Sequence, residues 1–92
     1  KVTDGQTTLV TDALFVKEKR YHFLEVDNTQ SMAENAVKIK RYKEMCKRGL
    51  FQKDFGYFPT VHIVTVSRSR MKRFAELCEG LPFKVYYHQD IR

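Results

Sequence analysis

The sequence has few of the features that mark several large classes of protein. Its two cysteines, Cys46 and Cys78, are far apart and form no CxxC pair, so neither a disulfide framework nor a zinc knuckle is indicated. No apolar run approaches the roughly 20 residues of a membrane-spanning helix, and no signal peptide opens the chain. A Gly-rich phosphate loop, a nucleophile elbow and a Cys-His pair at useful spacing are also missing. These absences predict a soluble, cytoplasmic domain and argue against an enzyme that acts on a small molecule.

Positive charge is what the chain has in excess. Seventeen Lys and Arg against eleven Asp and Glu give a formal net charge of +6 and a pI near 9.5. Such a balance is expected of a protein with a phosphate-rich partner and favours DNA. Ninety-two residues, 42% of them hydrophobic, suit one small domain with one core. The chain begins with Lys1 and not with Met, so we expect residues 1–92 to be a single domain from the C-terminal part of a longer protein.

Residues 9–27 predict an antiparallel hairpin, because two runs of β-branched, aromatic and aliphatic residues flank the charged tetrad at 17–20. If Glu18 and Lys19 form a two-residue turn, Asp12 lies opposite Glu25. Asp27 then shares the face of Glu25, since strand side chains alternate. A longer loop would shift the register and separate Asp12 from Glu25. The two-residue turn therefore predicts three acids on one patch.

Three acids on one patch need a neutralising partner. Like charges directly opposite each other destabilise a ladder by a few tenths of a kcal/mol to about 1 kcal/mol. A bound divalent cation, a neighbouring Lys or Arg, or a raised pKa would each relieve the repulsion. The residues alone leave these three alternatives open.

A helix is predicted at about 32–48, after a polar break at 28–31 and before Gly49. Apolar residues recur at three- and four-residue steps and predict a core face of Met32, Ala36, Ile39, Tyr42 and Cys46. The opposite face carries six cations: Lys38, Lys40, Arg41, Lys43, Lys47 and Arg48. A phosphate-facing role and ordinary solvation explain these cations equally well.

The second half predicts a strand, a helix and a strand. Residues 50–59 form an aromatic-rich connection that we expect to pack over a core edge. The β-branched run 60–66 predicts a strand buried on both faces, with His62 as a satisfied core or edge histidine. A helix follows to about residue 79, with a predicted core face of Met71, Phe74, Ala75 and Cys78. Residues 83–88 form the last strand.

Four cations open this second helix: Arg68, Arg70, Lys72 and Arg73. They oppose the helix dipole, which prefers acids there by roughly 0.3 to 1 kcal/mol each. The arrangement is favourable if a nucleic-acid phosphate binds the backbone N–H groups and the arginines. The alternative is that exposed arginines tolerate a small penalty.

The element order predicts an α/β (α+β) fold with a small mixed sheet of about four strands and right-handed crossovers between parallel strands. Asp12, then Glu25-Val26-Asp27 after the hairpin, then a basic helix, resembles the PD-(D/E)xK nuclease superfamily. Thr11-Asp12 stands where that family has Pro-Asp, and Asp27 stands where it has Lys. Some branches move the Lys to the following helix, where Lys38 is the candidate.

A longer pattern resembles the replication-relaxation family of plasmid and mobile-element proteins. It comprises Asp12-Ala13-Leu14-Phe15, Phe23-Leu24-Glu25-Val26-Asp27 with Thr29, Lys38-Ile39-Lys40-Arg41-Tyr42, and Val64-Thr65-Val66 before a basic helix. The resemblance implies a restriction-endonuclease-like core, a preceding winged-helix domain and a DNA-associated role in plasmid replication or mobilisation.

The resemblance to the nuclease superfamily also implies roles for individual residues. Asp12, Glu25 and Asp27 would be Mg²⁺ ligands and catalytic residues, and Lys38 the catalytic base or charge stabiliser. If the domain is active, it would be a Mg²⁺-dependent endonuclease. The residues expected to bind DNA are Lys40, Arg41, Arg68, Arg70, Lys72 and Arg73. The alternative is a non-catalytic domain of the same fold, in which Lys38 or Arg41 only neutralises the acids and which forms a homodimer or docks to a replication partner.

Overall fold

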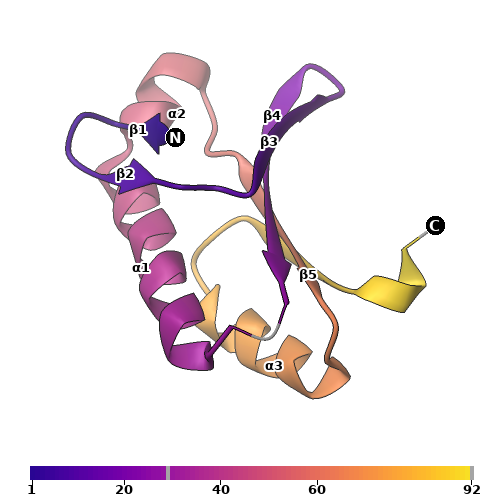
Figure 1. Cartoon of the computed structure of the whole chain (residues 1–92). Helices are drawn as coiled ribbons and strands as arrows, with labels where there is room; N and C mark the ends of the chain where they lie inside the picture. The colour runs from indigo at the N-terminus through magenta and orange to yellow at the C-terminus, as the bar shows by residue number, and fades with distance from the viewer. Residues whose placement is uncertain (29, 92) are drawn as a thin grey trace.

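The computed structural model describes residues 1–28 and 30–91 as a four-stranded sheet with helices on one side (Figure 1). Thr29 of the longer motif pattern lies outside the described residues. The order of the sheet is β3-β4-β5-β6, and its strands are β3 (Ala13–Lys17), β4 (Arg20–Asp27), β5 (Thr60–Thr65) and β6 (Phe83–Tyr87). Strands β3 and β4 are antiparallel, whereas β4, β5 and β6 are parallel to one another. The predicted mixed α+β fold with about four strands is confirmed.

The predicted hairpin register is also confirmed. Ala13 pairs with Leu24, Phe15 with His22, and Lys17 with Arg20, so Glu18 and Lys19 form the two-residue turn. Both turn residues have positive φ, 54° and 65°, which costs an L-residue roughly 1–2 kcal/mol. Glu18 and Lys19 therefore disfavour the conformation that the turn requires. The strands set the register, because a one-residue slip would move the buried Phe23 to the other face.

Helix α1 (Met32–Arg48) has the predicted ends. The Ser31 hydroxyl accepts a hydrogen bond from the Glu34 N–H at 3.1 Å, and Gly49 terminates the helix in the left-handed conformation with φ 75°. Its core face is rotated from the prediction: the buried residues are Asn35, Ile39, Tyr42 and Met45. The predicted core residues Met32, Ala36 and Cys46 are only half-buried. Helix α1 instead turns Asn35 toward Asp27 at the end of β4.

The predicted connection 50–59 contains an additional helix, α2 (Leu50–Phe55), which the sequence analysis missed. The aromatic packing expected there is present: the Phe51 ring lies 6.4 Å from Phe23 and 5.9 Å from Phe58. A two-stranded sheet of β1 (Val2–Thr3) and β2 (Thr8–Leu9) encloses a turn at Asp4-Gly5 and buries Leu9 beside α1. Helix α2 and the sheet of β1 and β2 close the end of the core that lies away from α3.

Helix α3 (Arg68–Leu77) ends two residues before the predicted boundary. Ser67 precedes it, but its hydroxyl lies 2.9 Å from the Ser69 hydroxyl and does not cap an N–H group of the helix. Phe74 and Cys78 are buried, while Met71 and Ala75 are half-buried. Strand β6 is followed by a 3-10 turn, η1 (His88–Asp90), so the last predicted strand is one residue too long.

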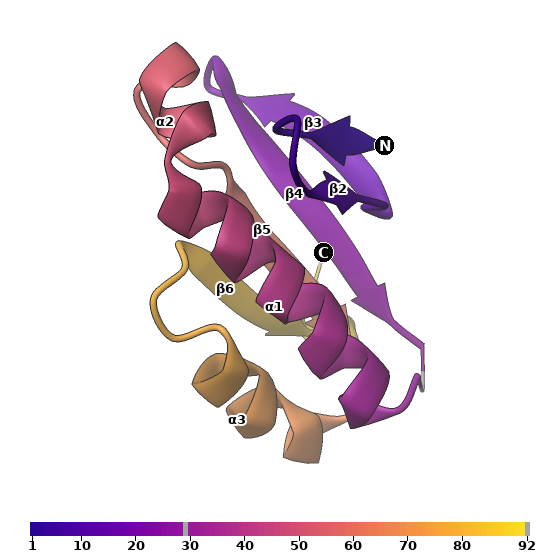
Figure 2. The same cartoon turned by 90° about the vertical axis from the view of Figure 1, so that its left-hand side faces the viewer.

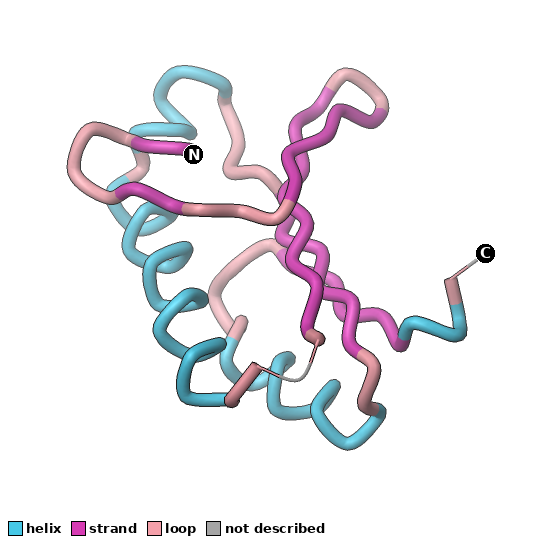
Figure 3. The backbone as a smooth tube through the Cα atoms, viewed as in Figure 1, coloured by secondary structure: helices cyan, strands magenta, loops and turns pink. Residues whose placement is uncertain are grey.

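Helices α1 and α3 cover the same face of the sheet (Figures 1 and 2). The order β4-β5-β6 advances in one direction, so crossovers of one handedness must lie on one side. In the part of the chain that the structure describes, no α-helix lies on the opposite face, and only the short 3-10 turn η1 is drawn on that side (Figure 3). The predicted burial of β5 on both faces is therefore wrong: Val61, Ile63 and Thr65 are buried, and the alternate residues are only half-buried.

The core lies between the sheet and the two long helices. Its buried members are Leu9, Phe23, Ile39, Tyr42, Met45, Phe58, Val61, Ile63, Phe74, Cys78 and Leu81. Among the described residues, no helix is long and apolar enough to cross a membrane.

Candidate functional site

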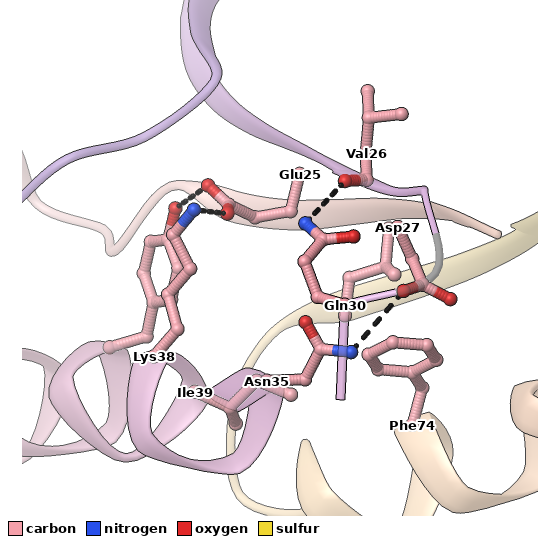
Figure 4. A pocket seen from close by; sticks show the side chains of 10 residues that line it. Glu25, Val26, Asp27, Gln30, Asn35, Lys38, Ile39 and Phe74 are labelled. Carbon is pink, nitrogen blue, oxygen red and sulfur yellow. Dashed lines mark hydrogen bonds and ion pairs between the residues drawn. The ribbon is translucent and has the colours of Figure 1, made fainter. Parts of the chain in front are cut away.

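Glu25 interrupts the apolar face of β4 with a carboxylate that is only 8% exposed. Its Oε1 contacts the Nζ of Lys38 from α1, and its Oε2 accepts a hydrogen bond from the Tyr42 hydroxyl at 2.7 Å (Figure 4). Lys38 and Tyr42 are four residues apart and both contact Glu25, so the prediction of Lys38 on the face opposite Tyr42 is wrong. Burial and the neighbouring Glu25 raise the pKa of Tyr42, so its hydroxyl remains a proton donor. The sequence predicted Tyr42 only as a core residue.

Asp12 lies beside Glu25, as the hairpin register predicts. The Asp12 N–H donates to Glu25 Oε2 at 3.2 Å, and the Val26 N–H donates to Asp12 Oδ2 at 2.7 Å. These two bonds hold the carboxylates where β4 passes the start of β3. Asp12 is exposed, and its Oδ1 has no protein partner among the described residues. The pair therefore presents one buried and one solvent-facing carboxylate.

Asp27 lies in a separate, buried polar cluster and is 2% exposed. Its Oδ1 is 3.2 Å from Arg70 Nη2. The same oxygen is 3.3 Å from Asn35 Nδ2, and Figure 4 marks this hydrogen bond. Its Oδ2 accepts a hydrogen bond from the Thr65 hydroxyl at 2.7 Å. Arg70 reaches inward from α3 and also contacts the Gln30 carbonyl oxygen. An internal cation thus neutralises the third acid.

The expected convergence of three acids on one metal is consequently not observed. Within residues 1–28 and 30–91, no group of three or more His, Cys, Asp or Glu side chains could hold a metal ion. Asp12 and Glu25 are together, but Asp27 points toward α3 and its arginine. No signal in the sequence indicated Arg70, Asn35 or Thr65 as partners of Asp27, because each comes from a different element.

A cavity of about 20 Å³ lies between the two acidic groups, lined by residues that include Glu25, Asp27, Lys38 and Phe74 (Figure 4). This volume holds about one water molecule. A nucleotide cannot enter it. A phosphate would therefore have to approach from the exposed side, where Asp12 lies.

The six cations expected to bind DNA are placed differently from one another. Lys40, Arg41, Lys72 and Arg73 are exposed and have no ion-pair partner among the residues described. Arg68 is exposed but pairs with Asp90 at 3.4 Å and lies 4.2 Å above the Tyr87 ring. Arg70 is turned inward, with 17% of its side chain exposed. Four of the six are thus available on the helix side of the molecule.

Comparison with known protein families, with curated proteins and with solved structures found no match to this chain. The resemblance carried by the motifs therefore stays a hypothesis.

Proposed function

We propose that this chain is a DNA-binding domain with a nuclease-like fold from a plasmid replication or mobilisation protein, with Asp12, Glu25 and Lys38 as its reaction centre. The observation that carries the proposal is the contact between Glu25 and Lys38 directly beside Asp12. Two carboxylates and an ammonium group from three elements meet at one point of the sheet. Phosphodiester cleavage needs oxygen ligands for a cation and a positive charge near the phosphate.

The residues present fit a Mg²⁺ ion at two of the three expected ligands. Asp12 and Glu25 supply carboxylate oxygens, the donor type that Mg²⁺ prefers, and Asp12 Oδ1 faces solvent. Both oxygens of Glu25 also have partners, so an ion there would have to displace the partly exposed Lys38 from Oε1. Asp27 does not fit, because it is buried and Arg70, Asn35 and Thr65 occupy both of its oxygens. When bound, the ion polarises a phosphate oxygen and lowers the pKa of a water ligand. One or two carboxylates with remaining positions for water and phosphate are usual for Mg²⁺.

Lys38 is placed to act on a phosphate as well as on Glu25. One third of its side chain is exposed while its ammonium group contacts Glu25. The carboxylate fixes the position of the ammonium group, which then holds positive charge where a phosphoryl oxygen gains negative charge. Tyr42 keeps Glu25 in place through its own hydrogen bond, so it is a positioning residue.

DNA would be held by the four available cations on α1 and α3: Lys40, Arg41, Lys72 and Arg73. Each Lys or Arg that neutralises a phosphate releases counterions. The logarithm of affinity should therefore fall by roughly 0.9 per contact for each log unit of salt. Four contacts would give a slope of about −3.6.

A nicking assay on supercoiled plasmid with Mg²⁺ tests the reaction centre. Wild type should nick, Asp12→Asn and Glu25→Gln should lose nicking by about 10²-fold or more, and the matched change Asp54→Asn, at an exposed acid on α2, should leave it intact. Equal products from all four proteins would refute the reaction centre. DNA binding that does not depend on salt, or the absence of DNA binding, would refute the proposal that the cations on α1 and α3 hold DNA.

The second candidate function is a non-catalytic domain of the same fold that forms a dimer or docks to a replication partner. The observation that favours it is that Lys38 and Arg70 already neutralise Glu25 and Asp27 without a metal. Light scattering that shows a stable dimer, together with no calorimetric heat on Mn²⁺ addition and no nicking, would support this alternative over the first.

A further inference from the structure

The face of the sheet opposite α1 and α3 is open in the described part of the chain. Its side chains come alternately from all four strands and, apart from Lys17, Arg20 and Lys84, are half-buried: Ala13, Phe15 and Lys17 of β3; Arg20, His22, Leu24 and Val26 of β4; Thr60, His62 and Val64 of β5; Lys84 and Tyr86 of β6. No α-helix of the described chain lies on it (Figures 1 and 2). This face has the composition of a packed layer and not of a solvated one.

A row of four rings, one from each strand, crosses this face. Phe15 stacks on His22 at 5.0 Å between ring centroids and an interplanar angle of 12°. His22 lies 5.0 Å from His62, and His62 stacks on Tyr86 at 5.7 Å. The His22 and His62 rings are 2.9 Å apart between Nδ1 and Nε2, and His62 Nδ1 is 2.8 Å from the Tyr86 hydroxyl.

The ring row argues against single-stranded nucleic acid as the ligand. Base-binding platforms present ring faces on which bases stack. Here the faces of the two central rings, His22 and His62, are covered by neighbouring rings. The remaining members of the surface include four aliphatic or methyl side chains, Ala13, Leu24, Val26 and Val64, which favour protein packing.

The charged residues of this face indicate the charge of the protein that binds it. Lys17, Arg20 and Lys84 are the exposed charged residues of this face, and the strand register places all three on the same side of the ring row. Lys84 and Lys17 also lower the pKa of His62, after the larger effects of burial and of His22. Among the described strand residues that face this side, none is acidic. A second copy would therefore place cations against cations.

The size of the surface also argues against a second copy of this chain. Four strands about 4.8 Å apart and about five residues long give an area of roughly 19 by 17 Å, or about 320 Å². A stable pair of proteins of standard size buries about 800 Å² on each partner. A single helix, about 10 Å wide, fits within the surface. We propose that the open sheet face binds an amphipathic α-helix of a partner protein, with an apolar stripe over Leu24 and Val64 and acidic residues on the flank that faces Lys17, Arg20 and Lys84.

Two synthetic helical peptides of 18 residues test this proposal, both with the same Leu and Ala stripe, one with Glu and one with Lys on the flanks. Fluorescence anisotropy with the whole 92-residue chain should show the Glu peptide binding at least about tenfold more tightly. The double variant Lys17→Glu/Lys84→Glu, which changes only exposed residues, should reverse this preference. Leu24→Glu should abolish binding, whereas Val37→Glu on the exposed side of α1 should not change it.

Equal affinity of the two peptides, no binding, or an unchanged preference in the double lysine variant would overturn the proposal. So would binding of a labelled oligothymidylate that Leu24→Glu abolishes, because the surface would then be a nucleic-acid platform. A dimer in light scattering that Leu24→Glu dissociates would assign the face to a second copy. None of these results bears on nicking or on the helix-side cations, which lie on the other face of the sheet.

Discussion

Replacing Arg70 with Met should destabilise the fold more than any exposed substitution. The change keeps most of the side-chain volume but leaves the carboxylate of Asp27, which is 2% exposed, without its cation. Removing one partner of a buried ion pair typically costs about 3–5 kcal/mol, because the other charge stays buried. A chain of 92 residues is expected to have roughly 5–14 kcal/mol of stability, at 0.05–0.15 kcal/mol per residue. The variant would lose a large part of the total.

Equilibrium unfolding in urea measures the loss. The midpoint should fall while the slope m is unchanged, since both proteins expose the same surface on unfolding. In thermal melts a domain of this size shifts by about 4–8 °C per kcal/mol, so the melting temperature should drop by at least about 12 °C. The matched control is Arg73→Met on the same helix, an exposed cation without an ion pair among the described residues, which should stay within about 0.5 kcal/mol of wild type.

A double-mutant cycle with Asp27→Asn separates charge from packing. In the Asp27→Asn background this buried carboxylate is gone, so Arg70→Met should cost about 1 kcal/mol or less, and the coupling energy should reach about 2 kcal/mol or more. If Arg70→Met cost the same in both backgrounds, the effect would be one of lost packing, and the account of Asp27 as an internally neutralised acid would be refuted.

Three further predictions concern single residues. Tyr42→Phe removes the donor to Glu25 and should lower stability by about 1–3 kcal/mol in urea unfolding; no loss would show that water replaces the hydroxyl. Because burial and neighbouring cations lower the pKa of His62 in the folded state, the folded protein binds fewer protons than the unfolded chain below about pH 6.5. Stability should therefore fall as the pH drops from about 7 to about 5, and less so in His62→Gln; equal slopes would contradict this origin. Gly49→Ala places a Cβ at φ 75° and should cost about 1–2 kcal/mol in thermal melts, and an unchanged melting temperature would show that α1 can end differently.

Pattern and spacing were enough to predict the main sheet, both long helices and the hairpin register. The alternation around Phe23 and Glu25 fixes which residues of β4 face the helices, and the two-residue turn then follows from the spacing of the two runs. Helix α2 was missed because its six residues are too few to show a helical period and are rich in aromatic residues. The burial of β5 was overestimated because a β-branched run indicates a strand but does not show whether a second layer covers it.

The candidate site could be predicted only where it depends on local register. Asp12 meets Glu25 because they face each other across one hairpin. Lys38 was predicted on the helix face opposite Tyr42, but both residues contact Glu25. Asp27 was placed on the correct face, but its partners come from α1, β5 and α3. Contacts between elements far apart in the sequence depend on how the helices lie on the sheet, which hydrophobic period alone does not determine.

The parallel course of β4, β5 and β6 gathers the chain segments that leave these strands along one rim of the domain. Residues 30–31, 66–67 and 88–91 follow the carboxyl ends of the three strands there, next to the buried cluster of Asp27. The exposed segment 88–91 can lengthen or change without disturbing the packed layer beneath, whereas Ser31 caps α1 and the Gln30 carbonyl contacts Arg70. Variation in recognition among proteins of this architecture would therefore be expected to accumulate there, while the hairpin and the helix side stay constant.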